Sequence, residues 1–372
     1  MRTATITFHA SHNYGSMLQA FALQKMINRL GHDNEILNLR TDRQKWLYPK
    51  PDELLSRKDV KVKKFIRRML YFPFVKDLQI KHELFESFLQ KDLKLSRVYS
   101  NLQELNNADL PYDCFIAGGD QIWNTSPLDF DWSFYLPFVK TGRKISYAVS
   151  MGPHAEEQVT SLERIRKYLS SFDAISVREK GTKDLVSSLT DVPVVESLDP
   201  TLLLDKSEWE SFINSRATVK GDYIFVYSPS FNPVVYDIAD KLGQLLKKKV
   251  VTSIYHPRML QYSSLKYELA VGPWEFLDIL SKADLVVSGS FHAVVFSVIF
   301  NKPFWAINGA KDNRMRTFLE NTHLLHRSID KANLGKKVRG NIPCEFCDAE
   351  EFIQKGRIES MSYLSKAIEG KI

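Results

Sequence analysis

The chain of 372 residues is poor in cysteine, with only Cys114, Cys344 and Cys347. Three thiols are too few for the disulfide framework of a small secreted protein. Cys344 and Cys347 have the C-x-x-C spacing of redox and zinc motifs, but no second pair accompanies them, and an exposed turn is the favoured interpretation. The cysteines therefore assign no metal or redox function.

Long apolar runs are also missing. No stretch approaches the roughly 18 uncharged apolar residues that a membrane-spanning helix needs. The first ten residues, MRTATITFHA, lack the apolar core of a signal peptide. We therefore expect a cytoplasmic protein.

Common catalytic motifs are absent as well. The sequence contains no G-x-x-x-x-G-K-[ST], no G-x-G-x-x-G after its first strand, no H-E-x-x-H and no G-x-S-x-G. Their absence removes the main support for an ATPase, a dinucleotide-dependent enzyme, a zinc protease or a serine hydrolase. What is present is positive charge, a formal +7, which favours anionic partners such as phosphorylated metabolites, nucleic acid or an acidic membrane surface.

Strand and helix patterns alternate along most of the chain. Residues 3–8 are rich in β-formers, residues 17–31 repeat apolar positions at helical spacing, and residues 34–39 form the next strand pattern. A helix between two strands is a βαβ unit, which implies a parallel sheet. A second alternating series begins near Gly221. The pattern predicts an α/β fold of two Rossmann-like, doubly wound parallel-sheet domains that face a cleft.

The domain boundary is predicted near residue 205, where SLDPTLLLDKSEWESF combines a turn with a helix start. We expect an N-terminal domain over residues 1–205 and a C-terminal domain over residues 206–345. The amphipathic pattern of residues 346–372 predicts a last helix that packs across both.

A basic, mostly helical insertion is predicted over about residues 42–105. Its stretch RKDVKVKKFIRRMLYFPF holds seven basic residues against the single acid Asp59. Two interpretations stay open: a solvated helix face, or docking to an anionic bilayer. Nucleic acid is not expected as a partner, because no RNA-binding motif accompanies the charge.

His292 stands where a strand pattern stops at Ser-Gly-Ser and an apolar helix begins, in VVSGSFHAVVFSVIF. The first turn of a helix offers free N–H groups and a positive dipole end to an anion. An imidazole there can act as an acid or a base toward that anion, or it can merely cap the helix. The local sequence leaves both roles open.

Polar residues follow the predicted strands in both halves. Parallel strands bring such residues to one edge, where ligands bind. Arginines and histidines outnumber acids among them, which suits an anionic donor and a hydroxylic acceptor. These residues are His12, Asn13, Tyr14, Asp120, Gln121, Asn124, His154, Arg178, His256 and Arg258.

Six blocks, in this order, resemble the polysaccharide pyruvyl transferase family: HNYGSMLQAFALQ, GGDQIWN, KISYAVSMG, ISVREKGTKDL, LDPTLLL and ADLVVSGSFHAVVFSVIFNKPF. The resemblance runs from the first loop to about residue 310. It implies a GT-B-like fold and transfer of pyruvate from phosphoenolpyruvate to two hydroxyls of a sugar, giving a ketal on a cell-envelope or capsular polysaccharide precursor. It implies no metal and no further cofactor. Together with the basic segment, it suggests a lipid-linked acceptor at the inner face of the membrane.

The resemblance also assigns residues. His292 matches the family's catalytic histidine and Arg178 a donor-binding arginine. Many members carry arginine where this chain has Ser290, so Arg178, Arg258, Arg314 or Arg316 is expected to supply the cation that binds the donor. The acceptor side is expected to comprise His12, Asn13, Tyr14, Asp120, Gln121, Asn124 and His154.

Two other functions remain open from the sequence. A glycosyltransferase of the same fold would use a sugar nucleotide, with Glu268 or Glu275 as the available acid. An inactive binding module would recruit other assembly enzymes, with Ser290 marking decay of the donor site.

Overall fold

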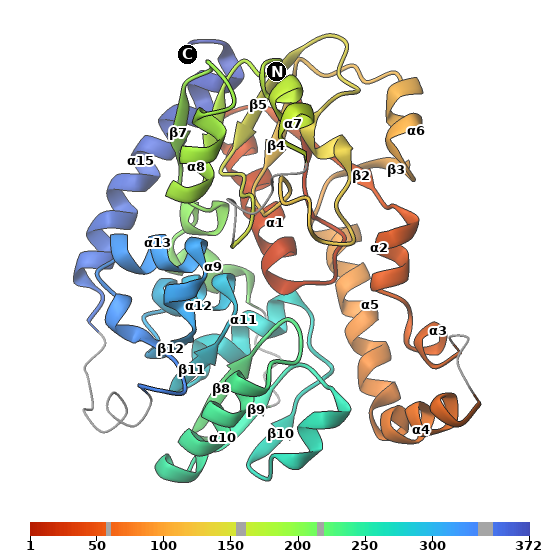
Figure 1. The fold of residues 1–372 in the computed structure, drawn as a ribbon, viewed down its shortest axis with the longest axis vertical. Helices are drawn as coiled ribbons and strands as arrows, with labels where there is room; N and C mark the ends of the chain where they lie inside the picture. Colours follow the sequence, from red (N-terminus) through yellow and green to blue (C-terminus); the bar gives the residue numbers. More distant parts are fainter. Residues whose placement is uncertain (57–60, 154–160, 214–218, 334–344) are drawn as a thin grey trace.

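Two parallel β-sheets, one in each half of the chain, organise the computed structural model (Figure 1). The structure describes residues 1–56, 61–153, 161–213, 219–333 and 345–372, without the side chains of residues 61–64. The predicted site residue His154 and the cysteine Cys344 lie outside the described residues. The predicted α/β architecture with two parallel sheets is confirmed.

The N-terminal sheet has the strand order β3-β2-β1-β4-β5, with parallel pairing throughout. Isolated bridges from Ile145 and Val149 connect its β5 edge to the segment of the β6–β7 pair, which continues the sheet. The strands are β1 (Arg2–Ile6), β2 (Asp33–Leu39), β3 (Leu95–Tyr99), β4 (Cys114–Gly118), β5 (Arg143–Tyr147), β6 (Ile175–Val177) and β7 (Val194–Glu196). The helices of this half outside the insertion are α1 (Tyr14–Arg29), α6 (Leu102–Asn107), α7 (Leu162–Leu169) and α8 (Lys180–Ser187).

The C-terminal sheet has the order β10-β9-β8-β11-β12-β13, again with parallel pairing. Its central strand β8 reads YIFVY and is buried along its whole length, as expected of a strand covered by helices on both faces. The strands are β8 (Tyr223–Tyr227), β9 (Lys249–Thr252), β10 (Leu265–Tyr267), β11 (Leu285–Ser288), β12 (Phe304–Ile307) and β13 (Ser328–Ile329). The helices of this half are α9 (Lys206–Phe212), α10 (Pro233–Leu246), α11 (Pro273–Lys282), α12 (Phe291–Ile299) and α13 (Asn313–Asn321).

The insertion is helical over most of the expected range. Its helices are α2 (Asp42–Leu47), α3 (Pro51–Ser56), α4 (Lys61–Tyr71) and α5 (Val75–Lys91). Residues 95–99 differ from the expectation, because they form the edge strand β3 of the N-terminal sheet. The β3 backbone finds hydrogen-bond partners on β2. The short local sequence does not reveal this pairing.

The two halves contact one another through a shared apolar core. The rings of Phe21 on α1 and Trp274 on α11 meet edge to face with centroids 5.0 Å apart. Trp209 on α9, just after the predicted boundary, lies within 6.4 Å of both rings. Much of the space between the halves is therefore filled by side chains.

The last helix, α15 (Cys347–Glu369), runs back along the N-terminal half (Figure 1). The Tyr363 hydroxyl donates to the Ser146 carbonyl at 2.9 Å, and Arg357 Nε donates to the Leu202 carbonyl at 2.6 Å. Near its start, α15 also lines a surface depression together with Val298 and Ile299 of α12. The helix thus connects the two halves.

Candidate active site at the junction of the two sheets

His292 is the second residue of α12, directly after the loop that leaves β11. Its imidazole packs against the first turn of α1, where a Cβ on Gly15 would lie 2.2 Å from His292 Nδ1. Only a glycine allows this approach. The histidine is 7% exposed, so the ring lies between an N-terminal and a C-terminal helix rather than in an open cleft.

The first turn of α1 is fixed by its own capping residue. The side chain of Asn13 accepts hydrogen bonds from the backbone N–H groups of Gly15 and Ser16 at 3.0 and 3.4 Å. Asparagine is among the preferred N-cap residues because it satisfies N–H groups that have no partner within the helix. The cap therefore fixes the helix end that faces His292.

Arg178 follows β6 and lies among three carboxylates. Its Nη1 donates to Asp199 Oδ2 at 2.6 Å, its Nε donates to Glu179 Oε2 at 3.4 Å, and its Nη2 lies 3.9 Å from Asp120 Oδ1. The guanidinium also lies 4.5 Å from the centroid of the Phe291 ring. We call His292, Arg178, Asp199, Asp120 and Glu179 the His292 cluster.

Asp199 links the arginine to the histidine. Its Oδ2 lies 2.6 Å from Arg178 Nη1 and 3.3 Å from His292 Nε2, and its Oδ1 accepts from the Thr201 backbone N–H and hydroxyl at 2.9 and 2.6 Å. Burial alone would raise the pKa of Asp199, but the neighbouring His292 and Arg178 and the Thr201 hydroxyl lower it. Asp199 is therefore an ionised, fully enclosed carboxylate.

The other two acids of the cluster differ from each other. Burial would raise the pKa of Asp120, but His292, Arg178 and the Ser16 hydroxyl, which donates at 2.5 Å, lower it. Burial raises the pKa of Glu179, although Arg178 and the hydroxyls of Thr182 and Ser150 oppose the shift. One cluster thus holds carboxyl groups with opposite pKa shifts, which is common at functional sites.

Two nitrogen atoms of the cluster are buried and make no hydrogen bond to the residues that the structure describes: Arg178 Nη2 and His292 Nε2. The distance of His292 Nε2 to Asp199 suits an ion pair, but the geometry does not suit a hydrogen bond. A buried donor without a hydrogen bond costs free energy, on the order of 1–3 kcal/mol. Such groups are typical of a site that binds a ligand.

A cavity of about 130 Å³ adjoins the cluster. Arg178 and Asp199 line it together with Phe291 and Arg314, whereas His292 is not part of its wall. Arg314 donates to Asp312 through Nε and Nη2 at 3.0 and 2.6 Å, and its Nη1 reaches Gln121 Oε1 at 3.3 Å. Two guanidinium groups, one from each half of the chain, therefore border one cavity.

The remaining predicted donor residues have other surroundings. Ser290 is the N-cap position of α12, and its backbone N–H donates to the Ser288 hydroxyl at 3.0 Å. Arg258 is exposed on a 3-10 turn, where His256 accepts its backbone N–H at 3.2 Å. Arg316 is exposed on α13 and pairs with Glu320 one turn along the same helix. The structure brings Arg178 and Arg314 together and leaves Arg258 and Arg316 at the surface.

The predicted acceptor residues separate into three environments. Tyr14 lies in the core, where its hydroxyl donates to the Val271 carbonyl at 3.1 Å and its ring stacks on Phe276. Asp120 belongs to the His292 cluster, and Gln121 adjoins it through Arg314. Asn124 lies 3.4 Å from Gln121 through its side-chain amide. Of the predicted acceptor residues that the structure describes, His12 lines an open cavity.

That cavity, which we call the acceptor-side cavity after the predicted role of His12, measures about 570 Å³ and lies in the N-terminal half. His12 Nε2 lies 2.9 Å from Glu86 Oε1, and Arg40 donates to Glu86 Oε2 through both Nη atoms at 3.2 Å. We call His12, Glu86 and Arg40 the His12 cluster. The cavity wall comprises Ala10, His12, Arg40, Gln44, Lys45, Tyr48, Lys50, Glu53, Gln79, His82, Glu83, Glu86 and Gln90.

The His292 cluster contains more acids than the residues singled out from the sequence. Arginine and histidine outnumber acids among those residues, whereas the cluster contains three carboxyl groups, one arginine and one histidine. Asp199 and Glu179 were not singled out, although Glu179 directly follows Arg178 and Asp199 lies in the block LDPTLLL. A buried arginine needs such counter-charges, and this is the signal that could have identified them.

Lys81 is a further cation that the sequence did not single out. Its Nζ donates to the Ser253 carbonyl at 2.8 Å and lies 5.0 Å from the centroid of the Tyr14 ring, so it joins α5 to the end of β9. Burial lowers the pKa of Lys81 to about 7. Its place among many basic residues of the insertion gave no sign of this environment.

No group of three or more histidine, cysteine or acidic side chains suited to a metal ion occurs among the described residues. Cys347 is exposed at the start of α15, and Cys114 is buried in β4. None of the helices that the structure describes combines the length and the apolar character that crossing a bilayer needs.

Comparison with known proteins identifies a family. Residues 13–310 match the sequence model of the family described as polysaccharide pyruvyl transferase. A search of curated proteins finds no significant match.

Solved structures with a similar fold cover nearly the whole chain. A UDP-N-acetylglucosamine 2-epimerase from Rickettsia bellii is 10% identical, with a TM-score of 0.52 and coverage of 100% of both chains. A putative UDP-N-acetylglucosamine 2-epimerase from Listeria monocytogenes is also 10% identical, with a TM-score of 0.54 and coverage of 98% of this chain and 90% of the other. At this identity the likeness concerns the fold alone, which is GT-B-like.

Proposed function

Because the chain belongs to the polysaccharide pyruvyl transferase family, we propose that it moves the pyruvyl group of phosphoenolpyruvate onto two hydroxyls of one sugar in a cell-envelope or capsular polysaccharide precursor. The proposal depends above all on one observation: Arg178 and His292 contact the same carboxylate, Asp199, and each has a buried nitrogen, Nη2 and Nε2, that makes no hydrogen bond to the described residues. An arginine and a histidine at the carboxyl ends of parallel strands suit a small anionic donor.

In the proposed reaction a proton is added to the methylene carbon of phosphoenolpyruvate, which leaves an oxocarbenium-like centre at C2. One sugar hydroxyl attacks C2 and loses its proton, and the C2–O bond to phosphate then breaks. A second hydroxyl attacks C2, loses its proton and closes the cyclic ketal. One sugar diol and one phosphoenolpyruvate thus give one ketal and one phosphate.

We assign the proton transfers to His292, with Asp199 orienting the imidazole and stabilising its charged form. Arg178 and Arg314 border the cavity of about 130 Å³ and would bind the carboxylate and the phosphate of the donor. Both guanidinium groups already contact carboxylates, so the donor would replace part of those contacts.

Access to His292 requires a movement in this proposal. The ring is 7% exposed and packs on Gly15, and it borders neither cavity. We propose that the two halves separate at the contact between α1 and α12, so that donor and acceptor reach the imidazole. Closure would then exclude water from the reacting centre.

The test is incubation with phosphoenolpyruvate and a panel of lipid-linked or nitrophenyl glycosides, read by mass for the added pyruvyl group. Phosphate release should depend on the acceptor sugar. Replacing Arg178 with Lys should raise the Michaelis constant for phosphoenolpyruvate, whereas the matched change at exposed Arg316 should leave it unchanged. Equal constants in both variants would reject the role of Arg178.

The alternative of a sugar-nucleotide glycosyltransferase has little support from its candidate acids. Glu275 Oε2 accepts the Gly272 backbone N–H at 3.1 Å and so caps α11. Glu268 follows β10 and fits no nucleotide motif. Inhibition by nucleoside diphosphates, with no effect of phosphoenolpyruvate, would favour this alternative. Phosphate release that depends on an acceptor would exclude an inactive binding module.

A further inference from the structure

The outer face of α4 exposes large apolar side chains. Phe65 is 69% exposed, Ile66 45%, Met69 59% and Phe72, directly after the helix, 80%. Positions i, i+1, i+4 and i+7 lie on one side of a helix, so these residues form one surface. Among the described residues, four of the fifteen exposed large hydrophobic side chains fall within these eight positions.

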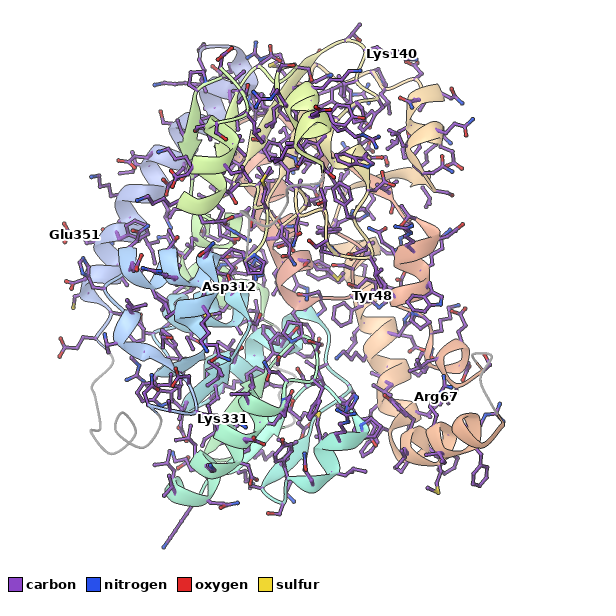
Figure 2. All side chains as sticks on the ribbon, viewed as in Figure 1. Tyr48, Arg67, Lys140, Asp312, Lys331 and Glu351 are labelled. Atoms are coloured by element: carbon purple, nitrogen blue, oxygen red, sulfur yellow. The ribbon has the colours of Figure 1, made fainter. Side chains whose placement is uncertain are left out.

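This surface belongs to a helix that is fixed from its other side. Arg67 Nη1 donates to the Leu54 carbonyl of α3 at 3.2 Å, and the Tyr255 hydroxyl donates to the Leu70 carbonyl at 2.8 Å. Figure 2 shows Arg67 at the outer end of the insertion, across the molecule from Glu351 on α15. The exposed residues are therefore held on an ordered helix and not on a loose end.

The charge of α4 has one sign. Its eleven residues, KVKKFIRRMLY, include five lysines and arginines and no acid. A helix that combines basic residues with an exposed apolar face is typical of proteins that lie in the interface of an anionic bilayer. Phe65, Ile66, Met69 and Phe72, with the exposed Arg68, form what we call the α4 surface.

We propose that the α4 surface docks the protein onto an anionic lipid bilayer, with its apolar side chains among the acyl chains and its basic residues at the headgroups. A second copy of the chain fits this surface less well, because pairing would bring two strongly basic helices together. Nucleic acid would neutralise the charge but would leave the apolar side chains exposed to water.

The position of α4 also bears on the acceptor. Glu53 of α3 lines the acceptor-side cavity, and the neighbouring residue Leu54 accepts the hydrogen bond from Arg67 of α4. One short helix therefore connects the α4 surface to the cavity. If the proposed function holds, a sugar carried on a membrane lipid would reach the cavity from this side.

The first experiment measures co-sedimentation of the full chain with vesicles of phosphatidylglycerol and phosphatidylcholine in equal parts. Phe65→Ser, Met69→Ser and Phe72→Ser together should weaken binding at least about a hundredfold, since three large side chains lose their apolar environment. The matched control is Leu245→Ser with Leu246→Ser, two exposed leucines of α10 that should not affect binding. Equal binding by the α4 variant and the wild type would overturn the proposal, as would an equal loss in the control.

The second experiment reverses charge. Lys63→Glu, Lys64→Glu and Arg68→Glu should weaken binding at least about tenfold at low salt, and the difference should shrink as salt screens the charges. The control reverses Lys241, Lys247 and Lys249, which are exposed near α10. Binding to pure phosphatidylcholine vesicles should be weak for all of these proteins.

Other outcomes would assign the α4 surface to a different partner. A wild-type dimer that the Phe65, Met69 and Phe72 variant dissociates, without vesicle binding, would indicate a second copy. Binding of single-stranded RNA without vesicle binding would indicate nucleic acid. Pyruvyl transfer to a soluble glycoside should be unchanged in every α4 variant, so failure of the docking proposal stays separate from failure of the proposed function.

Discussion

Two regions of the molecule contain the same three chemical groups in very different surroundings. In the His292 cluster, Asp199 lies between a histidine and an arginine and is 1% exposed. In the His12 cluster, Glu86 has the same two kinds of partner but is 28% exposed and lines a cavity of about 570 Å³. Because the chemical groups are alike, differences in behaviour between the two clusters report the effect of burial.

Because of burial, breaking an ion pair should cost more free energy in the His292 cluster than in the His12 cluster. Removing one partner of an enclosed ion pair leaves an uncompensated charge, whereas an exposed pair is screened by water and contributes little. The His292 cluster also retains two buried nitrogens without hydrogen bonds to the described residues. We infer that the enclosed cluster is maintained for chemistry and that the open cluster serves recognition.

The largest difference should appear in activity when each histidine is removed. His292→Ala should lower the rate of pyruvyl transfer by about 10²–10⁴-fold, the usual contribution of a general acid or base. His12→Ala should change the turnover number less than about tenfold and act mainly on the Michaelis constant for the acceptor. The measurement is ketal formation by mass, with thermal melting as the control for folding. Similar rate losses in the two variants would contradict the comparison.

The carboxylates should differ in stability. Asp199→Asn leaves Arg178 without its closest counter-charge and should lower the free energy of unfolding by about 3–5 kcal/mol. Glu86→Gln should cost less than about 1 kcal/mol, because its partners are partly exposed. Denaturant unfolding of both variants measures the difference. A loss of unfolding free energy for Asp199→Asn as small as that for Glu86→Gln would show that burial does not strengthen the dependence of Arg178 on Asp199.

The close approach of α1 to His292 can be tested without removing any charge. Gly15→Ala places a methyl group 2.2 Å from His292 Nδ1, so either the imidazole or α1 must move. We expect a loss of about 1–3 kcal/mol in unfolding free energy and a lower turnover number. Gly181→Ala in α8 is the matched control: its nearest contact would be 3.5 Å from Asn313, and the change should be neutral or stabilising.

The smallest expected effect concerns pH. Burial alone would raise the pKa of Glu86, but His12 and Arg40 lower it from its ordinary 4.5 to about 2. The unfolded chain therefore binds the proton more tightly, so this pair stabilises the fold above pH 4.5 and the contribution disappears as the pH falls toward 2. The difference in unfolding free energy between wild type and Glu86→Gln should therefore shrink as the pH falls from 4.5 to 2, by less than about 1 kcal/mol. A constant difference between the two proteins at all pH values would contradict the assignment.

The sequence predicted some features well because they depend on local periodicity. The alternating strand and helix patterns indicated two parallel sheets, and the end of the strand pattern after Val287 placed His292 at the first turn of a helix. Local patterns are less successful for a strand whose pairing partner is distant in the sequence. Residues 95–99 were expected in the helical insertion but form strand β3, because β2 supplies their hydrogen-bond partners.

The composition of the site was only partly predictable. Arg178, His292 and Asp120 were expected at strand ends and lie together, but Asp199 and Glu179 were not singled out, although they surround the same arginine. Arg258 and Arg316 were expected, like Arg178, as possible donor-binding cations, yet both are exposed. The identity of a side chain does not reveal how much water its neighbours leave around it.

Residue periodicity and chain direction are enough to predict the class of fold, the parallel direction of the strands and the placement of polar residues at their carboxyl ends. Tertiary packing alone establishes which of those residues share a carboxylate, which cavity each borders, and that His292 lies against Gly15 of the opposite half. Such contacts join separate segments, some as distant in sequence as Gly15 and His292, and their energies depend on burial, which is a property of the packed chain.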